Sequence, residues 1–173
     1  MKRRLFFLLL FPLIFILTCN KPDSNNQPGK LNAILEALHD TSSVNVLTVA
    51  HRALHIKYPE NSLAAIQHSI DASLDMIEID VRQTKDGVLI LMHDATVNRT
   101  TDGDGRVRDL TFEQIKKLVL KTEVNDSINH PVPLLEEVLH LTKDHILVDL
   151  DIMTLGDSNK NVHGSLANIV DSP

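Results

Sequence analysis

The stretch MIEIDVRQTKDGVLILMHD, residues 76–94, decides the fold because it joins two short apolar runs through a polar turn. Both runs predict β-strands, and TKDG is typical of the turn between them. In the first run, the period of two places Glu78 and Asp80 on one face, opposite Ile77, Ile79 and Val81. Neighbouring carboxylates repel each other unless a cation or a proton lies between them, so this strand is the first candidate for a functional site.

The flanking sequence alternates between segments of helical and strand periodicity. A strand is expected at 44–51, and a helix at 60–74 has Asn61 or Ser62 as its N-cap. Thr111 is expected to cap the next helix. Strands separated mostly by helices predict an α/β fold with a largely parallel sheet. The remaining segments are expected to be helices at 31–40, 110–120 and 133–144, and a strand at 145–152.

Charged residues gather toward the ends of these strands. The first strand ends in His51 and Arg52, and the third ends in His93. The fourth places Asp149 and Asp151 on the face opposite its aliphatic residues. Active sites form at the carboxyl ends of parallel strands in α/β sheets and barrels, so we expect these side chains to converge.

The residue types in this group indicate phosphoester chemistry. Acidic residues from different strands make an all-oxygen site for a hard cation such as Mg²⁺ or Ca²⁺. Two histidines can act as general base and general acid, and an arginine can bind an anion. Any one of these residues alone is more often a cap or a surface residue, so the interpretation depends on their joint placement.

The N-terminus predicts export. Residues 1–18 have a basic head and an apolar stretch that match a signal peptide. Cys19 follows at the position where a bacterial lipoprotein is lipidated, although a plain signal peptide or an uncleaved anchor are the alternatives. The polar residues 19–30 are expected to form a tether, and residues 31–173 a domain. We therefore expect an exported, membrane-anchored lipoprotein on the periplasmic or cell-surface side.

The composition excludes nucleic acid as a partner. Without residues 1–18, which hold three basic and no acidic residues, 14 Lys and Arg stand against 23 Asp and Glu, a net charge of −9. Nucleic-acid binding requires a basic face. The chain has no Trp, and four of its five Phe lie in the predicted signal peptide. The core must therefore consist of Leu, Ile and Val, which suits a parallel sheet covered by helices.

Four segments in the same order resemble the motifs of the glycerophosphodiester phosphodiesterases. They are AHRALHIKYPENSLAAI, MIEIDVRQTKDGVLILMHDATVNRTTDGDGRV, LTFEQIKKL and VPLLEEVL, within residues 47–151. The resemblance implies a TIM-barrel (β/α)8 fold. It also implies hydrolysis of glycerophosphodiesters to an alcohol and glycerol 3-phosphate with a divalent cation, Mg²⁺ or Ca²⁺. The expected partners are this small-molecule substrate and, through the lipid anchor, the membrane.

The resemblance also implies residue roles. His51 and His93 become the acid/base pair, in an order that stays open, and Arg52 holds the phosphate oxygens. The implied metal ligands are Glu78, Asp80 and Asp149. Glu60 lies at the edge of the site, where it binds the metal or orients an acid/base or phosphate-binding group, while Asn61 is expected to cap its helix.

Three positions depart from the family pattern. Ala53 stands where the family usually has Gly, and a positive φ there would cost about 1 kcal/mol. Asp149 replaces a glutamate that is one methylene longer. Asp151 replaces a lysine and removes a positive charge from the expected phosphate pocket.

Length is a further departure, because a TIM barrel needs roughly 250 residues. Residues 19–173 are expected to supply only about the first half of the barrel. We therefore expect a truncated family member, with a noncatalytic, membrane-anchored remnant as the alternative to an active hydrolase. The alcohol moiety of the substrate is left open.

Overall fold

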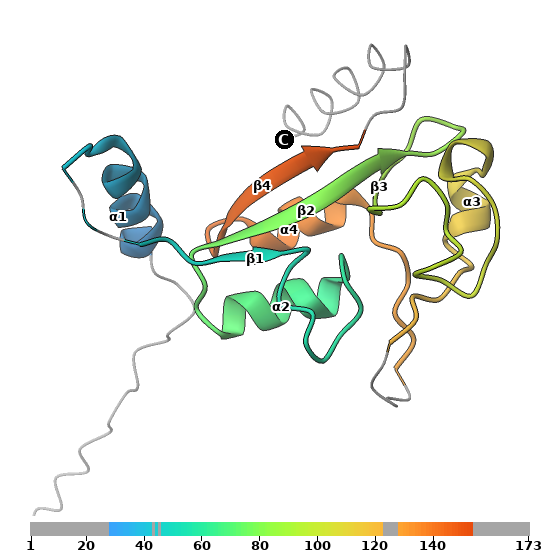
Figure 1. The fold of residues 1–173 in the computed structure, drawn as a ribbon, viewed down its shortest axis with the longest axis horizontal. Helices are drawn as coiled ribbons and strands as arrows, with labels where there is room; N and C mark the ends of the chain where they lie inside the picture. The colour runs from blue at the N-terminus through green and yellow to red at the C-terminus, as the bar shows by residue number, and fades with distance from the viewer. Residues whose placement is uncertain (1–27, 43, 45, 123–127, 154–173) are drawn as a thin grey trace, which may run out of the picture.

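The computed structural model describes residues 28–153 apart from 43, 45 and 123–127 (Figure 1). The predicted signal peptide and Cys19 lie outside the described residues. In the part of the chain that the structure describes, no helix is long and apolar enough to cross a membrane. The elements in order are α1 (Pro28–His39), β1 (Val49–His51), α2 (Leu63–Asp71), β2 (Met76–Gln83), β3 (Leu89–Leu91), the 3₁₀ turn η1 (Val107–Asp109), α3 (Phe112–Ile115), α4 (Leu135–Thr142) and β4 (Leu147–Ile152).

Strand β2 is the centre of a four-stranded sheet (Figure 1). Strands β1 and β4 pair with it in parallel, whereas β3 pairs with its last residues in antiparallel orientation. The expectation that His93 follows the carboxyl end of a parallel strand is therefore wrong, because β3 is antiparallel to β2. Because the hairpin reverses the chain, the Met92 N–H donates to the Asp80 carbonyl at 3.0 Å, and His93 returns to the middle of β2.

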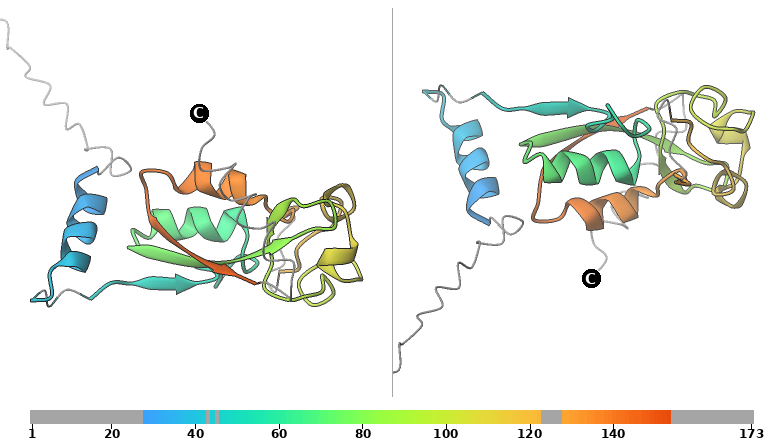
Figure 2. Two further views of the ribbon diagram at one scale, coloured as in Figure 1. Left: turned by 90° about the horizontal axis from the view of Figure 1, so that it is seen from above. Right: turned by 90° about the horizontal axis from the view of Figure 1, so that it is seen from below.

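The aliphatic face of β2 forms the main core. Ile77 and Ile79 are fully buried, and Val81 is 1% exposed. They pack with Ile66 of α2 and Val138 of α4, which lie on the same face of the sheet (Figure 2). The predicted alternation of β2 is confirmed, and the opposite face is left to its charged residues.

The ends of two predicted elements differ from the sequence expectation. Ser62 caps α2 by accepting from the Ala65 N–H at 3.1 Å, so the Ser62 alternative is confirmed. Asn61 does not cap this helix, because its side chain bonds to Asp80 instead. Strand β1 is limited to its last three predicted residues, and Val46 is 86% exposed.

Helix α1 lies beyond the end of the sheet where β2 begins (Figure 1). Lys30 of this helix donates to the carbonyls of Ser73 and Leu74 at 2.6 and 2.9 Å and forms an ion pair with Asp75 at 3.3 Å. The helix begins at Pro28, so the last three residues of the predicted tether are helical.

A second core is formed by β3 and the segment that connects β3 to α4. The predicted helix at 110–120 is reduced to the single turn α3, where Gln114 accepts from the Thr111 N–H at 2.9 Å. The chain leaves the helix because Val119 and Leu120 form isolated bridges with other segments. The buried members of this core are Ile90, Met92, Val97, Val107, Ile115, Leu120 and Val132.

Candidate active site

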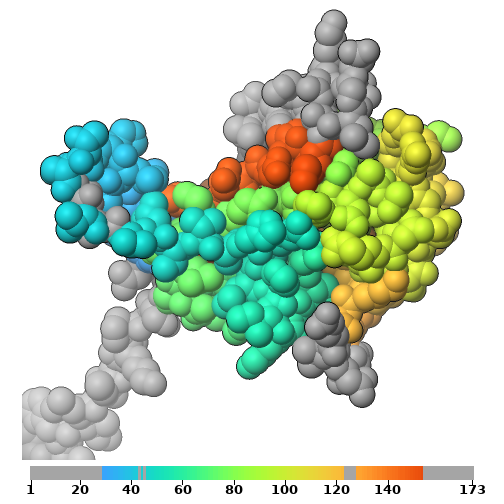
Figure 3. Space-filling view, viewed as in Figure 1, coloured from blue at the N-terminus to red at the C-terminus, as the bar shows by residue number. Residues whose placement is uncertain are grey.

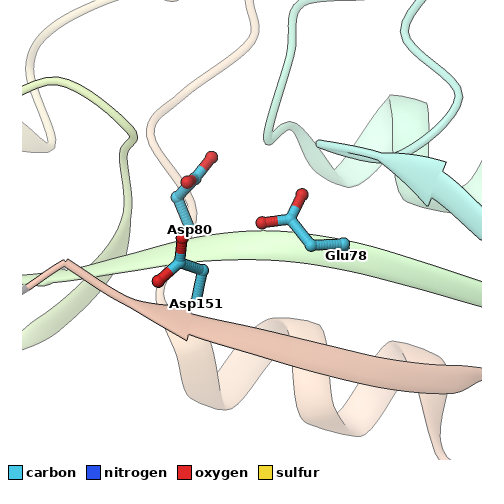
Figure 4. Close-up of side chains that lie close together, drawn as sticks. All are labelled: Glu78, Asp80 and Asp151. Carbon is cyan, nitrogen blue, oxygen red and sulfur yellow. The ribbon is translucent and has the colours of Figure 1, made fainter.

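Three carboxylates meet on the polar face of the sheet. The parallel register places Asp80 of β2 opposite Asp151 of β4, and Glu78 lies two residues earlier on the same face. One ligand oxygen from each of the three lies within 4.8 Å of the others. Figure 4 shows the side chains rising from the same side of β2 and β4. Asp80 is 1% exposed, whereas Asp151 is open to solvent.

The residues around this cluster neutralise only part of its charge. Nε of Arg52 lies 3.5 Å from Asp80 Oδ2, and the Arg52 backbone N–H donates to Glu78 Oε2 at 3.0 Å. Asn61 Nδ2 donates to Asp80 Oδ2 at 2.8 Å. With the guanidiniums of Arg52 and Arg82 near three carboxylates, the cluster still keeps an excess of negative charge. An all-oxygen donor set with this excess fits a hard divalent cation.

A left-handed turn links β1 to the site. Arg52 and Ala53 have φ values of 57° and 63°. The Ala53 N–H is directed at the carbonyls of Ala50 and Glu78, at 3.2 Å each. Position 53 therefore has the positive φ at which alanine carries a strain cost. The added methyl of alanine is buried in the core, so strain and packing oppose each other there.

The two histidines lie near different carboxylates: His51 is near Glu78 of the cluster, and His93 contacts Asp94 outside it. His51 is opposite Glu78 in the sheet, and its Nε2 lies 4.0 Å from Glu78 Oε2. The His51 side chain is 71% exposed and is available to a substrate. His93 Nδ1 lies 2.7 Å from Asp94 Oδ1. Because an ionised carboxylate only accepts hydrogen bonds, Nδ1 carries a proton and Nε2 is left for other contacts.

Arg99 joins the His93 segment to the loop before α2. Its guanidinium contacts both carboxylate oxygens of Glu60 and both of Asp94, at 2.7 to 2.9 Å. These hydrogen bonds lower the pKa of Glu60 and Asp94, and they raise the pKa of Arg99. Glu60 also accepts from Arg52 Nη1 at 3.1 Å. Figure 3 shows the surfaces of the two segments, near residues 60 and 100, adjoining.

The expected metal ligands are distributed differently from the sequence expectation. Glu78 and Asp80 lie together, but the third carboxylate in reach is Asp151 and not Asp149. Asp149 is exposed on the same face of β4, two residues before Asp151. It is paired with Glu78, whereas Asp151 is paired with Asp80. Of the two roles offered for Glu60, the structure places the residue in ion pairs with Arg52 and Arg99.

Sequence reasoning expected Asp151 to converge with the other charged residues but did not name it as a metal ligand, and it missed the contacts of Arg99 and Arg82. Arg82 Nε donates to the His93 carbonyl at 2.8 Å and Nη1 to that of Met153 at 3.2 Å, so it fastens the ends of β3 and β4 together. Its burial lowers the pKa of its guanidinium. The alternation of charged residues along β2 gave a signal for Arg82, because Arg82 is on the same face as Asp80. Arg99 lies in one of the segments that resemble the family, but nothing in the sequence indicated its contacts with Glu60 and Asp94.

Comparison with known proteins gives a consistent family match. A model of the glycerophosphoryl diester phosphodiesterase family matches residues 51–167. A glycerophosphodiester phosphodiesterase of Caldanaerobacter subterraneus subsp. tengcongensis is 40% identical over 111 residues, which cover 63% of this chain and 46% of that protein. One of Bacillus subtilis is 40% identical over 103 residues, which cover 54% and 35%. The chain spans about half the length of such relatives, or less.

Solved structures agree. A glycerophosphoryl diester phosphodiesterase from Parabacteroides distasonis gives a TM-score of 0.68 at 26% identity, with 83% of this chain and 50% of that chain covered. A glycerophosphodiester phosphodiesterase from Agrobacterium tumefaciens gives 0.64 at 28% identity, with 73% and 52% covered. The predicted α/β class and the partial TIM barrel are confirmed.

Proposed function

Because this chain belongs to the glycerophosphoryl diester phosphodiesterase family, we propose that it hydrolyses glycerophosphodiesters to glycerol 3-phosphate and an alcohol. The observation that carries the proposal is the meeting of three carboxylates with His51 and Arg52 on one face of the sheet. The relatives named above as glycerophosphodiester phosphodiesterases support the substrate class.

Glu78, Asp80 and Asp151 would hold the divalent cation, Mg²⁺ or Ca²⁺. When bound, the cation supplies Lewis-acid stabilisation of negative charge on a phosphoryl oxygen. Asp149, opposite Glu78 on the same face, is a further candidate ligand. Glu60 orients the Arg52 guanidinium, which binds the non-bridging oxygens of the phosphodiester.

His51 and His93 transfer the protons of the reaction. One accepts the proton of the oxygen that attacks phosphorus, and the other protonates the alcohol oxygen as its bond to phosphorus breaks. At His93 this exchange falls to Nε2, because Asp94 occupies Nδ1.

The test is release of glycerol 3-phosphate from glycerophosphocholine by the full chain with Mg²⁺, with Ca²⁺ and with chelator. We expect metal-dependent turnover that falls about 10²- to 10⁴-fold in His51→Ala. His55→Ala is the matched control, because His55 is also exposed and lies in the neighbouring loop. Absence of turnover in a folded sample would contradict the proposed activity.

We also propose that residues 1–18 direct export and that Cys19 is lipidated, which would place the enzyme on a membrane surface. Metabolic labelling with radioactive palmitate tests this in cells that express the chain. Label is expected on the wild type and not on Cys19→Ser. Equal labelling of the two proteins would refute lipidation at this residue.

A further inference from the structure

Arg99 links the two functional groups of the site that come from different loops. Arg52 follows β1, and His93 follows β3. Arg52 pairs with Glu60, besides its contact with Asp80, and His93 pairs with Asp94. Arg99 pairs with both Glu60 and Asp94. The contacts form an unbroken chain from the anion-binding guanidinium to the imidazole.

The contacts of Arg99 use the planar fork of its guanidinium. Nη1 and Nη2 donate to Glu60 Oε2 and Oε1 at 2.9 and 2.8 Å. Nε and Nη2 donate to Asp94 Oδ2 and Oδ1 at 2.7 and 2.9 Å. Each carboxylate is therefore held by two hydrogen bonds, which fixes its rotation as well as its position. A lysine could not reproduce this arrangement, because it is a point charge on a flexible stem.

The backbone on both sides of the link is held in place. Thr101 is fully buried, and its N–H and hydroxyl donate to the Val97 carbonyl at 2.9 and 2.7 Å. The Lys121 N–H donates to the Thr100 carbonyl at 2.7 Å. On the other side, the Asn61 N–H donates to the Arg52 carbonyl at 3.0 Å. Arg99 thus connects two fixed backbone segments and does not merely cover a loose loop.

We propose that Arg99 is a positioning residue that holds Arg52 and His93 in a fixed mutual arrangement through Glu60 and Asp94. This inference rests on the proposed function, in which Arg52 binds the phosphodiester and His93 transfers a proton. Stability is a weak reason for the network, since half-exposed ion pairs contribute little to folding, and the Arg99 side chain is 49% exposed. Orientation is the stronger reason, because misplacing a reacting group by about 1 Å can cost about 10²-fold in rate.

The experiment compares the full chain with Arg99→Ala, Arg99→Lys and Arg108→Ala. Arg108 is a matched control, since it is more exposed and pairs only weakly with its neighbour Asp109, at 3.9 Å. Two readouts are taken: glycerophosphocholine turnover, and the ¹⁵N NMR signals of the His93 ring, assigned with His93→Gln. The second readout reports the Nδ1–H contact with Asp94 and needs no turnover.

We expect kcat/KM to fall about 10- to 100-fold in Arg99→Ala, with only partial recovery in Arg99→Lys. The His93 ring is expected to change from the Nδ1–H tautomer to a mixture in Arg99→Ala, while Arg108→Ala keeps both wild-type properties. If Arg99→Ala does not fold, Glu60→Gln separates the ends of the chain: KM is expected to rise while the His93 signals stay unchanged.

Unchanged His93 signals in Arg99→Ala, or turnover within twofold of Arg108→Ala, would overturn the positioning role. So would a shift of the His93 signals in Glu60→Gln as large as in Arg99→Ala. A wild-type chain without turnover would instead refute the proposed hydrolysis, and the NMR comparison would still decide whether Arg99 orients His93.

Discussion

The two faces of β2 differ in how completely their interactions are satisfied. On one face, Ile77 and Ile79 are fully buried against α2 and α4. On the other, Glu78 and Asp80 lie with Asp151 in a cluster of three carboxylates, which the nearby guanidiniums of Arg52 and Arg82 neutralise only in part. Alternate residues of a single strand therefore have different roles: one set forms the core, and the other forms the acidic cluster.

This difference between the faces of β2 separates the residues that stabilise the fold from the residues of the candidate site. The aliphatic face needs nothing beyond its helices, since burial of apolar area stabilises the fold. Repulsion between the carboxylates destabilises the acidic face, and the proposed binding of a cation would offset this repulsion. Substitutions on the first face should unfold the protein, and substitutions on the second should change what it binds.

The largest effect on folding is expected from Ile79→Ala. Removing three carbons from a fully buried position should lower the free energy of unfolding by about 2–5 kcal/mol. Urea denaturation measures this loss. Ile56→Ala is the control, because Ile56 is 80% exposed and should change stability by less than about 0.5 kcal/mol. Equal losses at both positions would break the comparison between buried and exposed residues.

Ala53 connects the core to the candidate site, since its side chain is buried in the core and it directly follows Arg52. Ala53→Val should lower the free energy of unfolding by about 2–3 kcal/mol, because a β-branched residue is strained at a φ of 63° and has no room. Ala53→Gly should stay within about 1 kcal/mol of the wild type, since relief of strain offsets the lost methyl. Thermal unfolding of both variants checks the order, and a valine variant as stable as the wild type would contradict it.

A smaller effect is expected from acid. The pKa of Glu60 and Asp94 is lowered in the folded state by Arg99, so their contribution to stability is present above their unfolded pKa values of about 4. This contribution is lost as the pH falls through the lower folded values. The urea midpoint should therefore fall more steeply below about pH 4 in the wild type than in Arg99→Ala. Parallel curves for the two proteins would argue against the network.

The smallest effect is expected from Asp151→Asn, and its sign is opposite. Without metal, this substitution removes repulsion at an exposed position and should raise the free energy of unfolding by about 0.5 kcal/mol. Chemical denaturation in the presence of chelator measures it. A destabilised variant would mean that the attraction of Asp151 to the Arg82 guanidinium outweighs its repulsion by Glu78 and Asp80.

The sequence predicted the strands and the acidic face of β2, because period-two alternation is a local property. It did not predict which carboxylate of β4 joins the cluster, because that depends on the register between β2 and β4. Asp149 and Asp151 share a face of β4, so the sequence pattern does not distinguish them. The pairing of Asp80 with Asp151 brings Asp151 into the cluster.

Tertiary contacts also overrode local pattern elsewhere. Asn61 is a good N-cap by type, yet it bonds to Asp80, 19 residues away. The helix predicted at 110–120 ends at Ile115, because Val119 and Leu120 form bridges with other segments. Arg99 lies 39 residues from Glu60, and no spacing rule connects two such positions before the chain is folded.

The proposed hydrolysis depends on the binding of a divalent cation at the acidic face of β2. The most direct measurement is calorimetric titration of the metal-free chain with Mg²⁺ and with Ca²⁺, alongside Glu78→Gln and the control His55→Ala. We predict saturable binding of at least one ion by the wild type and the control, and affinity at least about tenfold weaker in Glu78→Gln, because the variant loses a charged oxygen ligand. Absence of saturable binding in the wild type, or equal affinity in Glu78→Gln, would contradict the account.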